Sequence, residues 1–133
     1  PRAVEVRWER YALLGIHPLA PLSPRSAELR DEQLAFASDW ARRSRDRAVI
    51  AGDFNSSPWT HAFRSLFPSD TFLNTQRGHG FEATWRAGTP WQLPIDHIVV
   101  TDDLTVVERV VGPDLGSDHL PVFAEIGPRR LSP

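Results

Sequence analysis

The amino-acid sequence predicts a layered α/β domain. Short apolar runs of strand length recur along the chain, a long segment with helical apolar spacing separates the first two runs from the third, and further strands follow a Gly-rich loop. The chain has 133 residues, of which 41% are hydrophobic, and five Trp. This composition can build the core of one domain, or of part of a larger one.

Charge and composition exclude several classes of protein. The net charge is −2 and the pI is about 6.2, so no global basic field attracts nucleic acid. The absence of cysteine excludes disulfides and thiolate metal sites. Within this sequence we expect no signal peptide, and no apolar run approaches the ~20 residues of a membrane span. The chain begins at Pro1 and lacks methionine, so we expect its native start to lie upstream.

Strands are predicted from alternating or continuous apolar residues. The first two, at residues 3–8 and 11–16, are expected to form a hairpin around a tight turn near Glu9 and Arg10. A continuous apolar run predicts a buried strand over residues 47–54. Further strands are predicted at residues 81–85, 95–100, 105–111 and 120–126.

Two helices are predicted. Residues 25–45 carry apolar residues near helical spacing amid charged ones, and Ser23 or Ser26 is expected to cap this helix. The dipeptide Ser57-Pro58 is typical of an N-cap followed by the first helical residue, and it predicts a short helix over residues 59–67.

The remaining segments are predicted to be loops. Residues 19–24 hold two prolines, and residues 69–88 are rich in Gly and Thr. A loop as long as the second is typically functional or disordered. We expect residues 1–127 to form the folded part of the chain and residues 128–133 to form a flexible tail.

The first candidate site residues are Asp53 and Asn55, which follow the buried strand. Gly52 allows a sharp turn there, and alternation places both side chains on the same side of the chain. A carboxylate can orient a water molecule or hold a metal, and a carboxamide can donate to a phosphate oxygen. The alternative is turn chemistry, in which both residues cap the helix after Ser57.

Asp96 opens a strand and is followed by His97. An acid in an apolar strand needs a partner, because an unpaired buried charge is costly. Successive side chains of a strand point to opposite faces, so only one of the two is expected to face a given site. The alternative for His97 is a satisfied or half-exposed strand histidine.

Asp118 and His119 close a Gly-rich turn and open the last strand. Asp118 could bind a cation, and His119 could act as a general base, since its pKa lies near operating pH. A carboxylate on the far ring nitrogen would fix the tautomer and raise basicity, and Asp96 is the candidate. The alternative is a turn aspartate beside a surface histidine.

His17, which follows a strand and precedes Pro18, is the last candidate. A lone histidine is more often structural, so both interpretations stay open. A zinc site built from His17, His97 and His119 is disfavoured, because the three fall on different strand ends and one faces away.

The sequences Gly-Asp-Phe-Asn (52–55), Ile-Asp-His-Ile (95–98) and Ser-Asp-His (117–119), in this order, resemble the motifs of the endonuclease/exonuclease/phosphatase superfamily. That family includes deoxyribonuclease I, abasic-site nucleases of the exonuclease III type, sphingomyelinases and inositol polyphosphate 5-phosphatases. Residues 15–21 resemble its His-containing strand end, and the resemblance covers residues 11–126. The amino-acid sequence around the motifs is similar to that of a bacterial branch of the family, whose members are often tethered to a membrane by a segment upstream of this domain.

The resemblance implies a role for each matching residue. His119 resembles the catalytic histidine, and Asp96 resembles the acid that orients it. Asp53 and Asn55 resemble the pair that positions the attacking water and stabilises the pentavalent phosphate.

Two further residues complete the implied site. Asp118 resembles an acid beside the divalent cation, and His17 resembles a phosphate-contacting histidine. The resemblance implies a Mg²⁺- or Mn²⁺-dependent phosphoesterase acting on nucleic acid, phospholipid or a small phosphate ester. His97 matches no family role.

The resemblance also implies a fold and its incompleteness. Residues 1–127 resemble the C-terminal portion of a deoxyribonuclease I-like α/β sandwich: one mixed, mostly antiparallel sheet with helices on one face and the second sheet missing. The family's first half supplies an Asn and the Glu that is the principal metal ligand, so we expect this segment to be inactive alone. An uncovered sheet face is an association site, which predicts a homo-oligomer. The alternative is a non-catalytic binding or self-association module.

Overall fold

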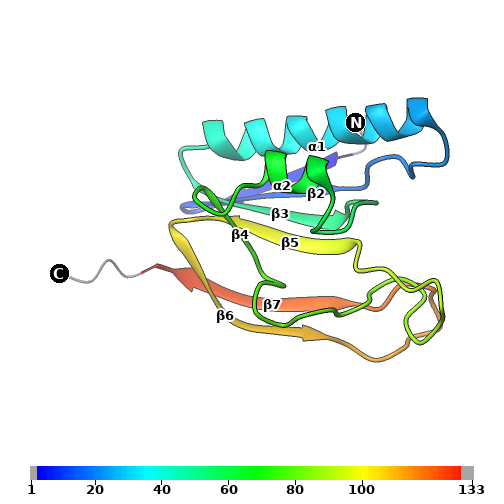
Figure 1. Cartoon of the computed structure of the whole chain (residues 1–133). Helices are drawn as coiled ribbons and strands as arrows, with labels where there is room; N and C mark the ends of the chain where they lie inside the picture. Colours follow the sequence, from blue (N-terminus) through cyan, green and yellow to red (C-terminus); the bar gives the residue numbers. More distant parts are fainter. Residues whose placement is uncertain (1–2, 130–133) are drawn as a thin grey trace.

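The computed structural model describes residues 3–129, and the α/β class predicted from the sequence is confirmed. In chain order the elements are β1 (Ala3–Trp8), β2 (Tyr11–Ile16), α1 (Pro24–Arg43), β3 (Arg47–Asp53), α2 (His61–Leu66), β4 (Phe72–Asn74), β5 (Asp96–Thr101), β6 (Leu104–Val111) and β7 (Val122–Pro128). Figure 1 shows both helices on one side of the main sheet and the β6–β7 pair on the other.

The main sheet brings three candidate residues to one edge. Its five strands have the order β1-β2-β3-β5-β4, with β2 and β3 parallel and all other neighbours antiparallel. The parallel pair is joined by a long crossover that contains α1. The ends of β2 and β3 therefore meet the beginning of β5, which places His17, Asp53 and Asp96 at the same edge.

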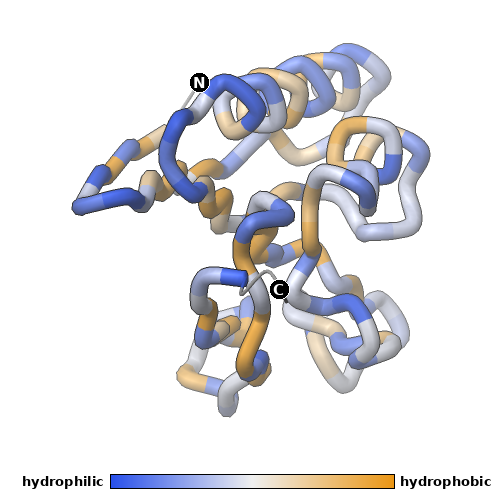
Figure 2. Tube along the Cα trace, turned by 90° about the vertical axis from the view of Figure 1, so that its left-hand side faces the viewer, coloured by the Kyte–Doolittle hydropathy of each residue, from blue (hydrophilic) through white to orange (hydrophobic). Residues whose placement is uncertain are grey.

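Helix α1 begins at a capping box that uses both predicted cap residues. The Ser23 hydroxyl accepts the Ser26 N–H at 3.1 Å, and the Ser26 hydroxyl accepts the Ser23 N–H at 2.8 Å. One side of the helix buries Leu34, Ala37 and Ala41 against the sheet. Figure 2 shows the resulting alternation of hydrophilic and hydrophobic bands along the helix.

Phe54 anchors the turn after β3 in the core. It is fully buried, and its ring centroid lies 5.9 Å from that of Phe63 and 5.7 Å from that of Phe67. The side chain of Phe54 therefore points into the layer between sheet and helices. Aromatic burial of this kind fixes the backbone on either side of the ring, where the candidate residues Asp53 and Asn55 lie.

The second sheet of the sandwich is present as two strands, so the expectation that it is missing is corrected. Strands β6 and β7 pair antiparallel and form a separate sheet. Leu104 and Ile126 from this sheet pack with Val49 and Val100 on the face of the main sheet opposite the helices. The two sheets come together because each has an apolar face that must be buried.

The short helix begins later than predicted. Helix α2 starts at His61 and its N-cap is Thr60, whose hydroxyl accepts the Phe63 N–H at 3.2 Å. The predicted cap, Ser57, instead lies in a turn in which its carbonyl accepts the Thr60 N–H at 3.2 Å. Threonine is also a suitable N-cap residue, and here the hydroxyl of Thr60 takes the place that was predicted for Ser57.

The prediction of a strand near residues 81–85 was wrong. The strand in this region is β4, which pairs with β5, and Trp85 forms only isolated bridges with Leu93 and His119. Gly78 and Gly80 have positive φ, so the chain turns repeatedly between β4 and Trp85. Residues 81–85, with Phe81 and Trp85 at their ends, therefore lie in the loop between β4 and β5.

Strand pairing extends past Gly127. Strand β7 ends at Pro128, and the Arg129 N–H donates to the Asp103 carbonyl at 2.8 Å. Most of the predicted flexible tail, residues 130–133, lies outside the described residues.

Large apolar side chains remain exposed on β1, β6 and β7: Val4, Val6, Trp8, Val107, Val110 and Phe123. An apolar surface is an association site when such side chains lie together, and the predicted self-association stays a prediction. Neither of the described helices is long and apolar enough to cross a membrane.

Candidate active site

Gly52 is required by the geometry of the strand end that carries Asp53. Its φ is +144°, and a Cβ at this position would lie 1.9 Å from the Ile16 carbonyl oxygen of β2. Only glycine permits so close an approach between the two parallel strands. The glycine of the Gly-Asp-Phe-Asn motif thus sets the distance between β2 and the acid that follows it.

Asp53 lies in a cluster of titratable groups. It pairs directly with Asp96 across β3 and β5, and its Oδ2 lies 3.4 Å from His17 Nε2 and 3.9 Å from His119 Nε2. Burial raises the pKa of Asp53, and the negative charge of Asp96 adds to the rise against the opposing N–H of Asn55 and the two histidines. The cluster therefore holds two carboxylates that repel each other unless a cation or a proton lies between them.

His119 is held by Asp96. Its Nδ1 lies 2.9 Å from Asp96 Oδ2 and 3.1 Å from Oδ1, so the Nδ1–H donates to the carboxylate and Nε2 is left as the free acceptor. Burial disfavours the charged imidazole, but the hydrogen bond and charge of Asp96, together with Asp53 and Asp118, outweigh it and raise the pKa of His119. The structure thus brings together the two residues paired in the sequence analysis.

His17 and Asn55 flank this cluster. The His17 side chain is 65% exposed, so it contacts Asp53 from the solvent side. Asn55 has a positive φ of 48°, and its side-chain amide donates to the Pro18 carbonyl at 3.1 Å. Its backbone N–H donates to Asp53 Oδ1 at 2.8 Å. Asn55 thus combines the predicted turn chemistry with a position beside the acid, and one amide hydrogen remains for a ligand.

His97 faces away from the cluster, as strand alternation predicts. It is 2% exposed, and its Nε2–H donates to the Ser56 carbonyl at 2.9 Å. Its ring packs against Phe54 and Phe63, and burial lowers its pKa to about 4. His97 is a neutral core histidine, and it shares no site with His17 or His119.

Asp118 contacts Trp85. Its Oδ2 accepts the indole N–H at 3.0 Å, and its backbone carbonyl accepts the Arg86 N–H at 2.8 Å. Its charge contributes to the raised pKa of His119. Asp118 is not one of the three residues that converge as metal ligands, so its role beside a cation stays a prediction.

Thr84 is a residue of this site that the sequence did not reveal. It is fully buried, and its hydroxyl accepts the backbone N–H groups of Ile95 at 3.2 Å and Asp96 at 3.1 Å. Its carbonyl accepts the Leu120 N–H at 2.6 Å. A threonine inside a long polar loop carries no sequence signal for such a role, because its partners lie 11 and 12 residues away.

Asp53, Asp96 and His119 could hold a divalent cation. One ligand atom from each lies within 4.8 Å of the others. Two carboxylates and an imidazole are suitable donors, and a cation would relieve the repulsion that helps to raise the pKa of Asp53. Within residues 3–129 no glutamate joins this group.

The chain was compared with models of protein families and with curated proteins. Residues 2–119 match the model of the Endonuclease/Exonuclease/phosphatase family. No match was found among curated proteins.

Solved structures share the fold. An endonuclease/exonuclease/phosphatase from Beutenbergia cavernae has a TM-score of 0.72 and 25% identity, covering 95% of this chain and 38% of that one. A mannosyl-6-phosphatase from Bacteroides thetaiotaomicron has a TM-score of 0.63 and 17% identity, covering 88% and 50%. The human Nocturnin catalytic domain with bound sulfate has a TM-score of 0.61 and 16% identity, covering 90% and 47%.

The chain spans about half the length, or less, of these structures. The likeness confirms the deoxyribonuclease I-like fold predicted from the sequence. Since the family match covers most of its residues, this chain belongs to the endonuclease/exonuclease/phosphatase family.

Proposed function

We propose that the protein is a divalent-metal-dependent phosphoesterase and that this chain carries its water-activating residues. The observation that carries the proposal is the contact between Asp96 and His119, which leaves Nε2 of the imidazole as a free acceptor beside Asp53. The family groups nucleases and phosphatases, all of which hydrolyse phosphoesters. A histidine held in this tautomer is suited to take a proton from water.

In the proposed step, the oxygen of a water molecule attacks phosphorus and the bond from phosphorus to the leaving oxygen breaks. The proton of the water goes to Nε2 of His119, and the Asp96 carboxylate stabilises the imidazolium that forms. Asp53 and Asn55 position the water and stabilise the pentavalent phosphate, and His17 contacts the phosphate from the solvent side.

The proposed cofactor is Mg²⁺ or Mn²⁺. Asp53 and Asp96 would hold it from within this chain, with Asp118 as a further acid nearby. The ion supplies charge neutralisation of the phosphate when it is bound. We expect this chain alone to be inactive, because the principal glutamate ligand implied by the resemblance is not among its described site residues.

The test uses the whole protein with Mg²⁺ against bis-p-nitrophenyl phosphate, plasmid DNA and a phospholipid. These three substrates separate the nucleic-acid, lipid and small-ester classes. His119→Ala should lower kcat by about 10²–10⁴-fold, the usual contribution of a general base. The matched control is His79→Ala, an exposed loop histidine, which should leave the rate unchanged. Hydrolysis that persists in His119→Ala would contradict the mechanism.

A second candidate function is a non-catalytic module that binds a partner or a second copy through its apolar strands. The observation that favours it is the exposure of Val4 at 68% and Phe123 at 60%. Sedimentation of this chain at micromolar concentration tests it, with Val4→Lys as the disrupting variant. A monomer at all concentrations would count against this candidate, and hydrolysis by the whole protein would favour the first.

A further inference from the structure

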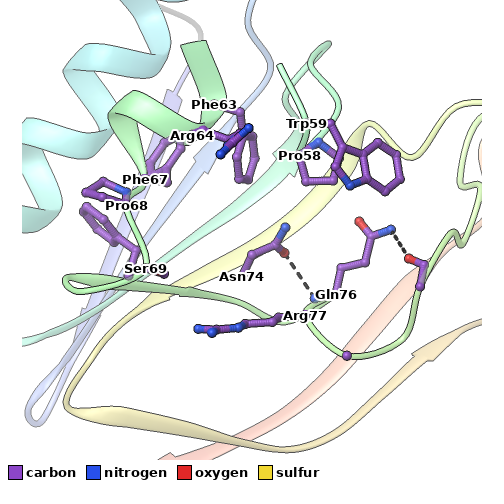
Figure 3. A pocket seen from close by; sticks show the side chains of 13 residues that line it. Pro58, Trp59, Phe63, Arg64, Phe67, Pro68, Ser69, Asn74, Gln76 and Arg77 are labelled. Carbon is purple, nitrogen blue, oxygen red and sulfur yellow. Dashed lines mark hydrogen bonds between the residues drawn. The ribbon is translucent and has the colours of Figure 1, made fainter. Parts of the chain in front are cut away.

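A cavity of about 490 Å³ lies between α2, β4 and the loop that follows β4. Figure 3 shows it with Pro58 and Trp59 on one side, Phe67 and Pro68 on another, and Gln76 below. It shares no lining residue with the cavity that contains Asp96 and His119. Its volume is that of a small-molecule site.

Gln76 places an unused hydrogen-bond acceptor at this cavity. The residue is 4% exposed, and its Nε2 donates to the Gly80 carbonyl at 3.1 Å, drawn as a dashed line in Figure 3. This bond fixes the amide orientation, because a flipped amide would face oxygen with oxygen. The Oε1 atom has no partner in the described part of the chain. Buried acceptors are rarely left unpaired, so this oxygen indicates a ligand that donates an N–H or O–H.

Aromatic rings line the same cavity. Phe63 and Phe67 form an apolar floor that is continuous with the core. Trp59 is 55% exposed, and its ring stacks at 8° on the ring of Phe81, which is 53% exposed. Exposed, parallel aromatic rings beside an apolar floor are suited to a planar ring.

Two arginines add positive charge. Arg64 extends from α2 and Arg77 from the loop after β4, so they approach the cavity from different elements. Neither forms an ion pair within residues 3–129. Asn74 lies between them in Figure 3, and its Oδ1 accepts the Gln76 N–H at 3.1 Å. Its amide hydrogens have no acceptor among the residues that the structure describes. These donors fit a phosphate group.

We propose that this cavity binds a nucleotide, either free or at the end of a nucleic-acid strand. The base stacks on Trp59 and donates an N–H to Gln76 Oε1, and the phosphate pairs with Arg64 and Arg77. Because Oε1 is sealed from water in the free protein, binding includes a local movement of the cavity lining that uncovers this atom. The proposal goes beyond phosphoester hydrolysis and does not depend on it.

The test is an NMR titration of the ¹⁵N-labelled chain with adenosine monophosphate in the absence of divalent metal. Saturable shifts are expected at the Gln76 side-chain amide and the Trp59 indole. Adenosine and inorganic phosphate should each bind at least about tenfold more weakly, a difference of about 1.4 kcal/mol. A short oligonucleotide with a terminal phosphate separates the two sources: tighter binding than the mononucleotide assigns the strand end, and equal or weaker binding assigns the free nucleotide.

The double variant Arg64→Gln/Arg77→Gln should weaken binding by at least about tenfold. The matched control is Arg25→Gln/Arg43→Gln, which removes the same charge from the exposed surface of α1 and should bind as wild type does. His119→Ala should also keep full binding, which separates this site from the proposed catalytic one.

Three outcomes would overturn the proposal. The first is the absence of shifts at saturating nucleotide, and the second is equal binding of inorganic phosphate, which would leave an anion site only. The third is wild-type affinity in the Arg64→Gln/Arg77→Gln variant.

Discussion

The hydroxyl of Thr84 accepts the backbone N–H of Asp96 at 3.1 Å. The carbonyl of the same residue accepts the Leu120 N–H at 2.6 Å, next to His119. Thr84 therefore holds the backbone beside both members of the Asp96–His119 pair. Since Thr84 is fully buried, water does not compete for its hydroxyl.

Thr84→Val should destabilise the fold by about 1–3 kcal/mol, because the valine is nearly isosteric and leaves two buried N–H groups without an acceptor. Urea unfolding measures the loss. Thr84→Ser keeps the hydroxyl and should recover most of the stability. Wild-type stability in Thr84→Val would show that the hydroxyl does not stabilise this backbone.

Asp96→Asn should lower the pKa of His119, because it removes the carboxylate that stabilises the imidazolium. The NMR shift of the His119 ring against pH measures it. A histidine with a raised pKa contributes stability that is present at low pH and lost as pH rises through that pKa, so the variant should lose stability mainly on the acidic side. In the whole protein, hydrolysis should rise as pH rises through the His119 pKa, because only neutral His119 accepts a proton. An unchanged His119 pKa in Asp96→Asn would refute the pairing.

The buried, neutral His97 should make the fold acid-sensitive. Its pKa falls from 6.5 to about 4 in the folded chain, so the unfolded state binds the proton first as pH is lowered. Its contribution to stability is complete above about pH 6.5 and is lost between about pH 6.5 and 4, with a magnitude of about 3 kcal/mol at 1.36 kcal/mol per pKa unit.

Urea unfolding at several pH values tests this prediction. His97→Gln keeps a donor for the Ser56 carbonyl and should flatten the dependence on pH. His61→Gln replaces an exposed histidine and should leave the dependence as it is in the wild type. A slope that survives in His97→Gln would assign the acid sensitivity to other groups.

Gly52→Ala should be among the most damaging single substitutions in the chain. The new Cβ would lie 1.9 Å from the Ile16 carbonyl oxygen at a φ that only glycine adopts readily, so β2 and β3 must separate. We expect a loss of at least about 2 kcal/mol by urea unfolding. Gly127→Ala, where the added carbon meets nothing within 4 Å, is the matched control. Near-equal stability of the two variants would contradict the close approach of the strands.

The regular elements were largely predictable, because each depends on its own residues. Apolar alternation predicted the β1–β2 hairpin, helical spacing predicted α1, and a continuous apolar run predicted β3. The misses, the start of α2 and the strand near residues 81–85, fall where turns and caps compete over short distances. The cap of α2 is decided between neighbouring residues, whereas the loop through Trp85 is held by bridges to Leu93 and His119.

The sequence by itself determined the family, the α/β class and the pairing of Asp96 with His119, because the three short motifs retain the residue types that the chemistry requires. Tertiary structure alone decided the rest. Thr84 acquires its role from backbone groups that reach it only after β5 and the segment before β7 come together. The cavity beside Gln76 likewise exists only once α2 packs over β4. Hydrogen bonds from a side chain to backbone groups distant in sequence leave no trace in residue type, and this is why such contacts cannot be read from the sequence.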